Sequence, residues 1–496
     1  MLFSSLLRNL EYKVLTGDPA ACEVLSICGD SRTVADRGLF VCIRGSVNDG
    51  HKYAAMAYKN GCRAFIVEQP VKLPSDASVV LVSDSRIALA KASAEFYRHP
   101  SKELHVVGIT GTKGKTTTAL SAFEILNGCG IPAAYIGGNG IKFGGRSIPT
   151  VNTTPESCVL QKYMRQMADA GIKYLIMEVS SQAIYMNRVH GIKFETAVFT
   201  NLSEDHIGGA EHPTFEHYRD CKRRLFTDFG AKNIIYNSDD PYAEYMVGDI
   251  AEVKKTSCSP SGNTCADIYT QNIENTRLPH ALSVSFEMNV DGSYFPAAVP
   301  MPGRFSVANA LLAAAICQTS GLGITEIITG LASVRAEGRF ETLSAENGAL
   351  FIIDYAHNGA SLSAALTTIR EFSPDRLICL FGSVGGRTRG RRAELGKTAA
   401  ALADFCILTS DNPDSEPPEK IIDDIAECFR EDGACPFIRI PDRREAIRFA
   451  VANAKNGDVI LLAGKGHEDY QLINGKKIPF SERSIIEESL LELAEV

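Results

Sequence analysis

The sequence lacks the features that mark membrane, secreted and zinc-binding proteins. Its apolar runs are all shorter than a membrane span, and its first fifteen residues are too soon interrupted by charge for a signal peptide. The fourteen Cys are scattered, with no C-x-x-C pair and no His-rich spacing beside them. This argues against a zinc site or a disulfide framework and for reduced, mostly buried thiols in a cytoplasmic protein. Trp is absent too, which excludes nothing.

Basic charge is also scarce. The chain has 51 Lys and Arg against 59 Asp and Glu, a net charge of −8, so it offers no diffuse basic surface to nucleic acid. An anionic substrate must therefore meet a local cluster of cations. One such cluster contains Arg387, Arg389, Arg391 and Arg392.

The 496 residues divide into three blocks, at 1–101, 102–335 and 336–496. In each block short apolar strands alternate with helical segments, and residues 310–317 form an apolar run typical of a buried helix. Such alternation predicts an α/β fold whose parallel sheets are covered on both faces. Ligands of these sheets bind beyond the carboxyl ends of the strands.

Residues 110–117, Thr-Gly-Thr-Lys-Gly-Lys-Thr-Thr, form the most informative motif. An apolar strand precedes them and a helical segment follows, so Gly111 and Gly114 can bring backbone N–H groups close to phosphate oxygens. Lys115 can reach the β- and γ-phosphates, and the Thr116 hydroxyl can bind Mg²⁺. A glycine-rich turn with an exposed lysine is the competing interpretation, but the flanking elements favour binding of ATP or a close relative.

Polar residues follow six predicted strands directly. These segments are 178–181, 201–206, 354–358, 382–387, 409–414 and 463–468. Any single one is better explained as a turn with a capping side chain. Six of them together with a phosphate loop indicate a site at the sheet edges.

Glu178 and His206 are candidates for holding a metal. Mg²⁺ prefers oxygen ligands and keeps several waters, so one carboxylate, Thr116 and phosphate oxygens suffice for it. His206 is a less usual ligand of Mg²⁺. It is equally well explained as a hydrogen-bonded residue that orients Asp205 or phosphate.

A set of further motifs occurs in one order along nearly the whole chain. They occupy residues 30–32, 38–41, 49–51, 111–117, 152–155, 177–181, 201–206, 218–226, 338–341, 354–357, 411–413 and 464–468. In these motifs the chain resembles the Mur ligases, ATP-dependent amide-forming enzymes of peptidoglycan precursor assembly. Among them it is similar to the tripeptide synthetases (MurE type), which add the third amino acid.

The resemblance implies three domains: one that binds the UDP substrate, a central ligase domain with a P-loop-type parallel sheet, and a Rossmann-like C-terminal domain that binds the incoming amino acid. It implies ATP, Mg²⁺ and a carbamylated Lys222, whereas the residues alone show a lysine on a probable helix. The implied catalytic residues are Lys115, Glu178, His206 and Lys222, and the implied metal ligands are Thr116, Glu178, His206 and Lys222. The implied nucleotide-binding residues are Gly111, Thr112, Lys113, Gly114, Lys115, Thr116, Thr117, Asn309, Arg339 and Asp354.

The resemblance also assigns the two other substrates. Binding of the UDP-muramoyl-dipeptide falls to Ser31, Arg32, Asn152, Thr153, Thr154, Ser180 and Arg188. Binding of the amino acid falls to Arg387, Asp411, Asn412, Asp414, Gly464 and Glu468. The implied reaction passes the γ-phosphoryl group to the terminal carboxylate of UDP-N-acetylmuramoyl-L-alanyl-D-glutamate, and the amine of a diamino acid then attacks the acyl phosphate. We expect a monomer with no nucleic-acid partner.

Asp414 bears on which amino acid is added. Family members that use meso-diaminopimelate carry Arg after Asp-Asn-Pro, and this Arg meets the extra carboxylate of the substrate. Two unit charges about 4 Å apart interact by roughly 4 kcal/mol at an effective dielectric near 20, and the change to Asp reverses the sign. We therefore expect L-lysine or a similar basic amino acid, with meso-diaminopimelate as the alternative. A further alternative is that Asp414 caps the helix that begins near Pro417.

Two other functions compete with this one. A folylpolyglutamate or cyanophycin synthetase would share the central motifs, but folate enzymes of this family lack a uridine-nucleotide domain like the one indicated by Asp30-Ser31-Arg32. A non-catalytic nucleotide-binding scaffold would be expected to have lost Lys115, Glu178, His206 or Lys222. All four are present.

Overall fold

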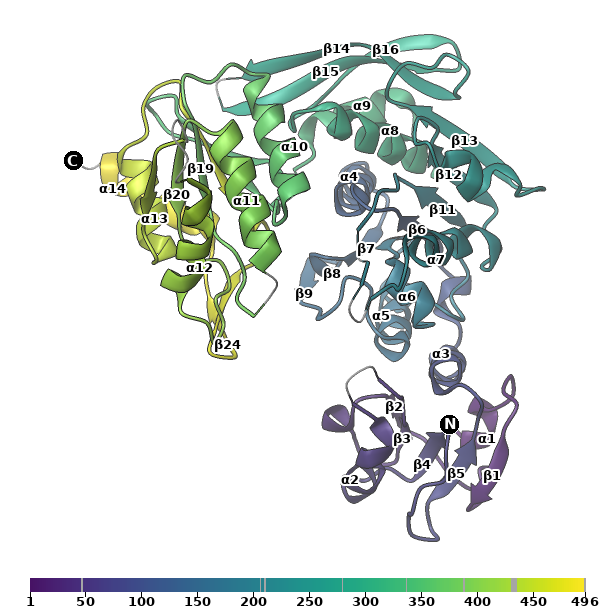
Figure 1. Cartoon of the computed structure of the whole chain (residues 1–496). Coiled ribbons are helices and arrows are strands. Elements are labelled where there is room, and N and C mark those ends of the chain that lie inside the picture. Colours follow the sequence, from purple (N-terminus) through teal and green to yellow (C-terminus); the bar gives the residue numbers. More distant parts are fainter. Residues whose placement is uncertain are drawn as a thin grey trace. The chain divides into compact units, whose positions relative to one another are not determined.

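A computed structural model describes residues 1–45, 48–205, 207–208, 211–278, 280–335, 337–386, 389–429 and 435–494 (Figure 1). Two predicted site residues, His206 and Arg387, lie outside the described residues. The chain forms two compact units. The first contains Met1–Tyr269 and Leu311–Ile324, and the second contains Thr270–Ala310 and Thr325–Val496.

The first unit begins with a five-stranded sheet in the order β1-β5-β4-β3-β2. Its strands are β1 (Lys13–Thr16), β2 (Ser26–Cys28), β3 (Gly38–Val41), β4 (Ala64–Val67) and β5 (Ser78–Leu81). Its helices are α1 (Phe3–Leu6), η1 (Ser31–Thr33), η2 (Gly50–Tyr53), α2 (Ala54–Lys59), α3 (Ser85–Phe96) and η3 (Pro100–Lys102). Strands β2 to β5 run parallel, and β1 joins antiparallel to β5.

A second sheet in this unit carries the phosphate loop. Within this unit, from β13 onward, its strands follow the order β13-β12-β11-β6-β10-β7-β8-β9. They are β6 (His105–Thr110), β7 (Ala133–Gly137), β8 (Gly140–Phe143), β9 (Arg146–Ile148), β10 (Tyr174–Glu178), β11 (Thr196–Phe199), β12 (Asn233–Asn237) and β13 (Lys254–Ser259). The pairing from β13 to β7 is parallel throughout.

Helices cover both faces of this sheet (Figure 1). The helices are α4 (Lys115–Gly128), α5 (Ser157–Asp169), α6 (Ser181–Tyr185), α7 (Phe215–Thr227) and η4 (Glu244–Gly248). One apolar core joins the sheet to α5, α6 and α7, with Met164 from α5 and Phe226 from α7 among its residues. Strand β6 is buried from Val106 to Thr110, as its β-branched sequence predicts. The loop that follows it is therefore held by a rigid strand.

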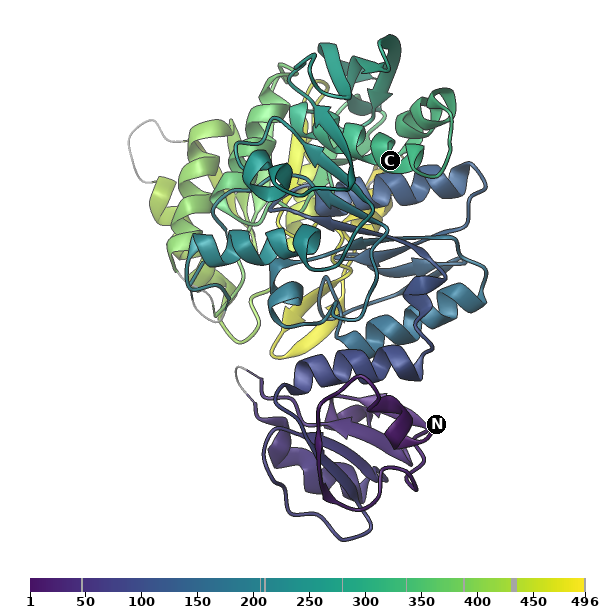
Figure 2. The ribbon, with the colours of Figure 1, turned by 90° about the vertical axis from the view of Figure 1, so that its right-hand side faces the viewer.

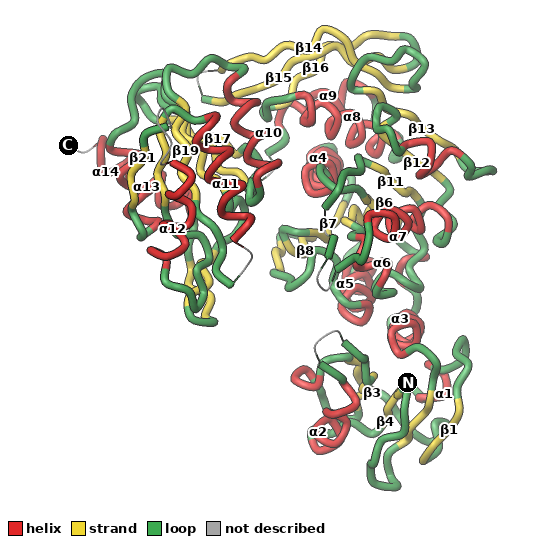
Figure 3. The backbone as a smooth tube through the Cα atoms, viewed as in Figure 1, coloured by secondary structure: helices red, strands yellow, loops and turns green. Residues whose placement is uncertain are grey.

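The second unit contains a doubly wound sheet in the order β17-β18-β22-β19-β20-β21 (Figure 3). Its strands are β17 (Glu341–Ser344), β18 (Leu350–Asp354), β19 (Leu377–Phe381), β20 (Phe405–Leu408), β21 (Phe437–Arg439) and β22 (Val459–Ala463). All neighbours are parallel except β17 and β18. Its helices are α10 (Gly359–Arg370), α11 (Arg389–Leu402), α12 (Pro418–Ala426), η5 (Glu427–Phe429), α13 (Arg443–Ala452) and α14 (Glu482–Ala494).

Alternate residues of β18 divide between two cores. Leu350 and Ile352 belong to the core that contains α10, α11 and α12, whereas Phe351 and Ile353 pack with α13 and α14. A hairpin of β23 (Tyr470–Ile473) and β24 (Lys476–Pro479) extends from this part of the chain (yellow, Figure 2). The remaining elements are β14 (Ile268–Leu278), β15 (Ala281–Val290), β16 (Ser293–Val299), α8 (Arg304–Gln318) and α9 (Ile324–Ser333).

The expected α/β class with parallel sheets is confirmed. The apolar run at 310–317 is a buried helix, since it lies within α8. All fourteen Cys are free thiols, and most of them are buried. Among the described helices, none is both long and apolar enough to traverse a membrane.

Candidate active site at the carboxyl edge of the central sheet

The phosphate loop joins β6 to α4. Gly114 takes a left-handed conformation, φ +82°, and the helix begins at Lys115. At Gly111 φ is +147°, and a Cβ there would come within 1.9 Å of the Thr200 hydroxyl oxygen. Both glycines of the motif are therefore required by the backbone. The N-terminus of α4 adjoins the loop, as a phosphate cradle requires.

The segment after β11 holds this loop in place. The Asn201 side chain accepts a hydrogen bond from Lys113 N at 2.9 Å and donates one to the carbonyl of Lys113 at 3.1 Å. The Thr200 hydroxyl donates to the same carbonyl at 2.7 Å. The ends of β6 and β11 are in register, with Thr110 opposite Phe199. The phosphate loop and the predicted strand-end segment at 201–206 therefore meet.

Glu178 lies buried at the end of β10, directly beside the loop. One carboxylate oxygen accepts from the Thr116 hydroxyl at 3.0 Å. The other accepts from the Tyr135 hydroxyl at 2.7 Å and from Gly138 N at 2.9 Å. A carboxylate and a hydroxyl at this spacing are the hard oxygen donors that suit Mg²⁺. Sequence reasoning missed Tyr135, whose position inside β7 gives no sign that its hydroxyl orients Glu178.

Lys115 and Lys222 approach the loop from two helices. Lys115 Nζ donates to the carbonyls of Gly111 and Thr112, at 2.8 and 2.9 Å. Lys222 comes from α7, is 2% exposed, and donates to the Gly111 carbonyl at 2.8 Å. Burial lowers the pKa of Lys222 well below its ordinary value, and the charge of Lys115 lowers it further, while Asp205 opposes the shift. The structure thus places Lys222 in the site rather than on a solvated surface.

The predicted substrate residues near Glu178 form a connected group. The Thr154 hydroxyl donates to the Glu178 carbonyl at 2.9 Å and accepts from Ser180 N at 3.2 Å. Arg188 donates to the Thr154 carbonyl at 3.2 Å and forms an ion pair with Glu156. Asn152 and Thr153 lie in the loop between β9 and α5.

Ser31 and Arg32 lie apart from this group, in η1 of the five-stranded sheet. Ser31 is 9% exposed, and Arg32 is exposed and paired with Asp30 at 2.6 Å. If the predictions are right, one UDP-muramoyl-dipeptide must reach from these residues to the group near Glu178.

In the second unit, the buried Lys465 contacts three of the residues predicted to bind the incoming amino acid. Lys465 Nζ donates to the side chains of Asn412 and Glu468 at 3.1 Å each and lies 3.7 Å from an Asp411 oxygen. Asn412 also donates to Glu468 at 2.8 Å. Burial raises the pKa of Asp411, and the charges of Lys465 and Arg443 oppose that rise. Lys465 belongs to the motif at 464–468, but the sequence alone does not indicate its role.

Gly464 precedes this lysine with φ +117°, and a Cβ there would lie 2.9 Å from an Asp411 oxygen. Of the predicted nucleotide residues, Asp354 lies next to this segment, since its carbonyl accepts from Gly464 N at 3.1 Å. Asp354 accepts from Phe340 N at 3.0 Å, and the Arg339 guanidinium lies 4.9 Å from the centre of the Tyr355 ring. Asn309 is a buried residue of α8.

Asp414 lies in a turn and does not cap the helix that begins near Pro417. Its carboxylate accepts from Gly475 N at 2.7 Å, in the turn of the β23–β24 hairpin, and its backbone pairs with Leu472 and Asn474. Helix α12 begins after Pro417 with no side-chain cap. The Asp414 carboxylate therefore has a structural role in a turn, which is an alternative to the predicted contact with the amino acid.

Two members of the arginine cluster form ion pairs within the second unit. Arg392 is 2% exposed and pairs with Glu416 at 2.6 Å and with Asp424 at 2.7 Å. Arg389 lies 3.6 Å from the same Asp424. Of the four arginines, Arg392 at least is a structural residue and not a free receptor for an anion.

Comparisons with known proteins identify the family of this chain. Residues 109–317 match the Mur ligase middle domain, and residues 338–466 match the Mur ligase, glutamate ligase domain. The chain is 37% identical over 493 residues to a UDP-N-acetylmuramoyl-L-alanyl-D-glutamate--2,6-diaminopimelate ligase of Caldanaerobacter subterraneus subsp. tengcongensis, covering 99% of each chain. It is 38% identical over 499 residues to a protein of the same name from Clostridium botulinum, covering 99% of this chain and 100% of the relative.

A solved structure under that same name has a TM-score of 0.71 and 28% identity, with 100% of both chains covered. A ligase from Acinetobacter baumannii, named for the addition of D-alanyl-D-alanine, has a TM-score of 0.64 at 19% identity and shows the shared fold. The phosphate loop, the Glu178 network, both domain matches and the full-length relatives lead to one conclusion. The chain belongs to the Mur ligase family of ATP-dependent ligases and resembles its tripeptide synthetases.

Proposed function

We propose that this ligase adds meso-diaminopimelate to UDP-N-acetylmuramoyl-L-alanyl-D-glutamate, as the third residue of a peptidoglycan precursor. The observation that carries the proposal is the name shared by its full-length relatives at 37–38% identity. Meso-diaminopimelate thus replaces L-lysine, the amino acid that the charge of Asp414 favours. The hydrogen bond from Gly475 N to Asp414 is consistent with the replacement, because it gives that carboxylate a structural role in a turn.

The central sheet supplies the residues for phosphoryl transfer. Lys115 and the N–H groups at the start of α4 neutralise charge as the γ-phosphoryl group passes to the terminal carboxylate of the dipeptide. Thr154, Ser180 and Arg188 hold the dipeptide beside Glu178. The incoming amine then attacks the acyl phosphate, which yields the amide, ADP and phosphate. Water must be excluded because the acyl phosphate would otherwise hydrolyse.

We propose that Thr116 and Glu178 hold Mg²⁺, which supplies charge neutralisation for the phosphates when bound. His206 remains a proposed ligand. Lys222 is proposed to react with CO₂. Its lowered pKa supports this, because carbamate formation needs the neutral amine, and burial of the ammonium is unfavourable. The resulting carbamate anion would attract the Lys115 ammonium, whereas the Lys222 ammonium repels it.

The three-part division into 1–101, 102–335 and 336–496 is proposed to separate the tasks. Ser31 and Arg32 of the first part hold the uridine diphosphate end. Asn309, Arg339 and Asp354 contact the nucleotide, and Asp411, Asn412, Gly464 and Glu468 hold the amino acid. We place the enzyme in the cytoplasm, since its cysteines are free thiols, as is usual in reducing compartments. We also propose that it is a monomer.

The test is a ligation assay with ATP, Mg²⁺, the UDP-linked dipeptide and one of three amino acids: meso-diaminopimelate, L-lysine or L-ornithine. Product mass and ADP release are measured together, with Lys115→Ala as the inactive control. We expect the highest kcat/KM with meso-diaminopimelate. An equal or higher value with L-lysine would overturn the choice of amino acid. Failure of all three, with no ADP released, would overturn the ligase proposal itself.

A further inference from the structure

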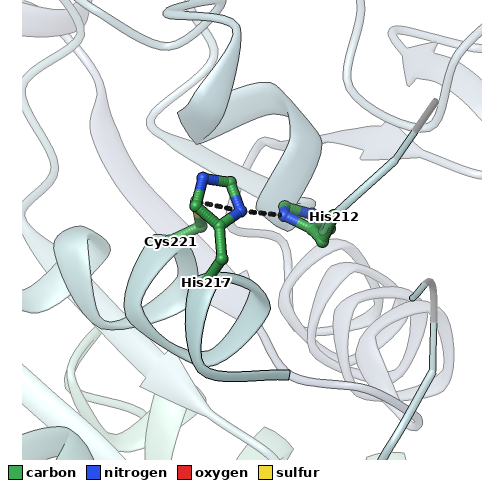
Figure 4. Close-up of side chains that lie close together, drawn as sticks. All are labelled: His212, His217 and Cys221. Atoms are coloured by element: carbon green, nitrogen blue, oxygen red, sulfur yellow. Dashed lines mark hydrogen bonds between the residues drawn. The ribbon is translucent and has the colours of Figure 1, made fainter. Parts of the chain in front are cut away.

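Three side chains with metal-binding atoms converge beside α7, where residues of α6 contact them (Figure 4). His217 and Cys221 lie on the helix, four residues apart, and His212 comes from the segment that precedes it. Their ligand atoms all lie within 4.8 Å of one another. His212 and Cys221 are 1% and 5% exposed, so the cluster is largely removed from bulk water.

The contacts within the cluster orient the ring nitrogens. His212 Nδ1 lies 2.8 Å from His217 Nδ1, and Cys221 Sγ lies 3.9 Å from both nitrogens of His217. His212 Nε2 lies 2.9 Å from the Ser181 hydroxyl, at the start of α6. A partner on the far nitrogen is the arrangement that fixes the tautomer of a metal-binding histidine.

The spacing is close to that of a tetrahedral site. Zn²⁺ binds His nitrogen at about 2.0–2.1 Å and Cys sulfur at about 2.3 Å, so neighbouring ligand atoms lie about 3.3–3.6 Å apart. The two imidazole nitrogens need to separate by about half an ångström, and the thiol needs to approach. Side-chain rotation supplies such shifts. The i, i+4 pair on one helix face keeps the two ligands of α7 in place.

We propose that His212, His217 and Cys221 bind one Zn²⁺ ion, with the fourth position filled by water. A cavity of about 500 Å³ adjoins the cluster and is lined by His217, Cys221, Asp220 and Tyr185 among others. It gives the ion a path of entry. The Cys221 thiol loses its proton to solvent when the Zn–S bond forms, and both imidazoles bind as neutral rings.

This site is distinct from the proposed magnesium site. Its donors are nitrogen and sulfur, which Mg²⁺ does not favour, whereas Thr116 and Glu178 offer oxygen. Lys222 follows Cys221 directly, but its amine reaches inward to the Gly111 carbonyl. A bound Zn²⁺ would tie the segment before α7 to the helix that carries Lys222. The sequence hides the site because the pattern H-x₄-H-x₃-C matches no familiar zinc spacing.

The experiment uses Co²⁺ as a spectroscopic substitute for Zn²⁺ on the full chain. Excess Mg²⁺ is present to fill oxygen sites, and the readout is the thiolate-to-cobalt charge-transfer band, which requires a Cys ligand. Wild-type protein should give this band with one equivalent of Co²⁺ and lose it when Zn²⁺ is added. Cys221→Ser should lack the band. The matched control is Cys265→Ser, which removes an exposed thiol elsewhere and should keep it.

A second measurement covers the case in which a variant folds poorly. Zn²⁺ should raise the melting temperature of wild-type protein and of Cys265→Ser, but not that of Cys221→Ser or His217→Gln. Ser181→Ala should weaken Zn²⁺ binding about 10- to 100-fold, since it removes the partner of His212. Absence of the band in the wild type, or an equal band in Cys221→Ser, would overturn the site and leave a hydrogen-bonded histidine pair.

Discussion

Lys115 and Lys222 both donate a hydrogen bond to the carbonyl oxygen of Gly111, each at 2.8 Å. One neutral acceptor cannot compensate two ammonium charges, and this repulsion contributes to the lowered pKa of Lys222. Two changes would relieve it. Phosphate can draw Lys115 away, and a carbamate can replace the charge on Lys222. Binding of phosphate and carbamylation of Lys222 would therefore each reduce the repulsion between the two ammonium groups.

Replacement of Lys115 tests the phosphate loop. Lys115→Ala should reduce turnover by at least about 10²-fold, since it removes a charge aimed at the transferring phosphoryl group. The fold should survive because Lys115 is not part of an apolar core. The measurements are steady-state ligation and thermal unfolding. Lys162→Ala, an exposed lysine of α5, is the control and should keep full turnover. A folded Lys115→Ala protein with normal turnover would rule out the assignment.

Replacement of Lys222 tests the carbamate. Lys222→Ala should be nearly inactive, and acetate or formate in solution should restore part of the activity by filling the vacated space with a carboxylate. Lys222→Met fills that space with an apolar side chain and should not be rescued. Ligation rates across a series of acid concentrations provide the measurement. Equal rescue of both variants would show that the acids act elsewhere.

The buried amine also predicts a pH dependence of stability. Without CO₂, the folded pKa of Lys222 lies below that of the unfolded chain, about 10.4. Between these two values the unfolded chain binds more protons, so this group's contribution to stability increases as pH rises. In this window, the difference in free energy of unfolding between wild type and Lys222→Met should increase in favour of wild type, by up to about 1.4 kcal/mol per pH unit. Urea unfolding at several pH values measures the difference, and parallel curves would contradict it.

Sequence reasoning located the loop and the strand ends because they depend on local chemistry. Gly111 and Gly114 have positive φ, and a glycine pattern reports that directly. Partnerships across the fold were harder to see. Tyr135 and Lys465 are buried polar groups whose contacts come from distant strands. The contact of Asp414 could not be predicted for the same reason, since its partner Gly475 lies 61 residues away in the chain.

Lys465 is predicted to hold the C-terminal cluster together. Lys465→Met would leave the buried Asp411 and the partly exposed Glu468 without their shared cation. Removal of one partner from a buried ion pair costs about 3–5 kcal/mol. The free energy of unfolding, measured with urea, should fall by an amount in this range. Lys397→Met, at an exposed position of α11, should change it little. A loss below about 1 kcal/mol would mean that the cluster does not depend on the lysine charge.

Asp414 separates stability from the choice of amino acid. Asp414→Asn keeps an acceptor for Gly475 N and tolerates the observed φ of +52°, so it should fold normally. Asp414→Ala loses the hydrogen bond and is strained at this φ, so it should be destabilised by about 1–3 kcal/mol. If the carboxylate serves the hairpin turn, Asp414→Asn removes a charge without changing the ratio of kcat/KM for meso-diaminopimelate to that for L-lysine. A shift of that ratio by tenfold or more toward meso-diaminopimelate would show that Asp414 repels the substrate carboxylate after all.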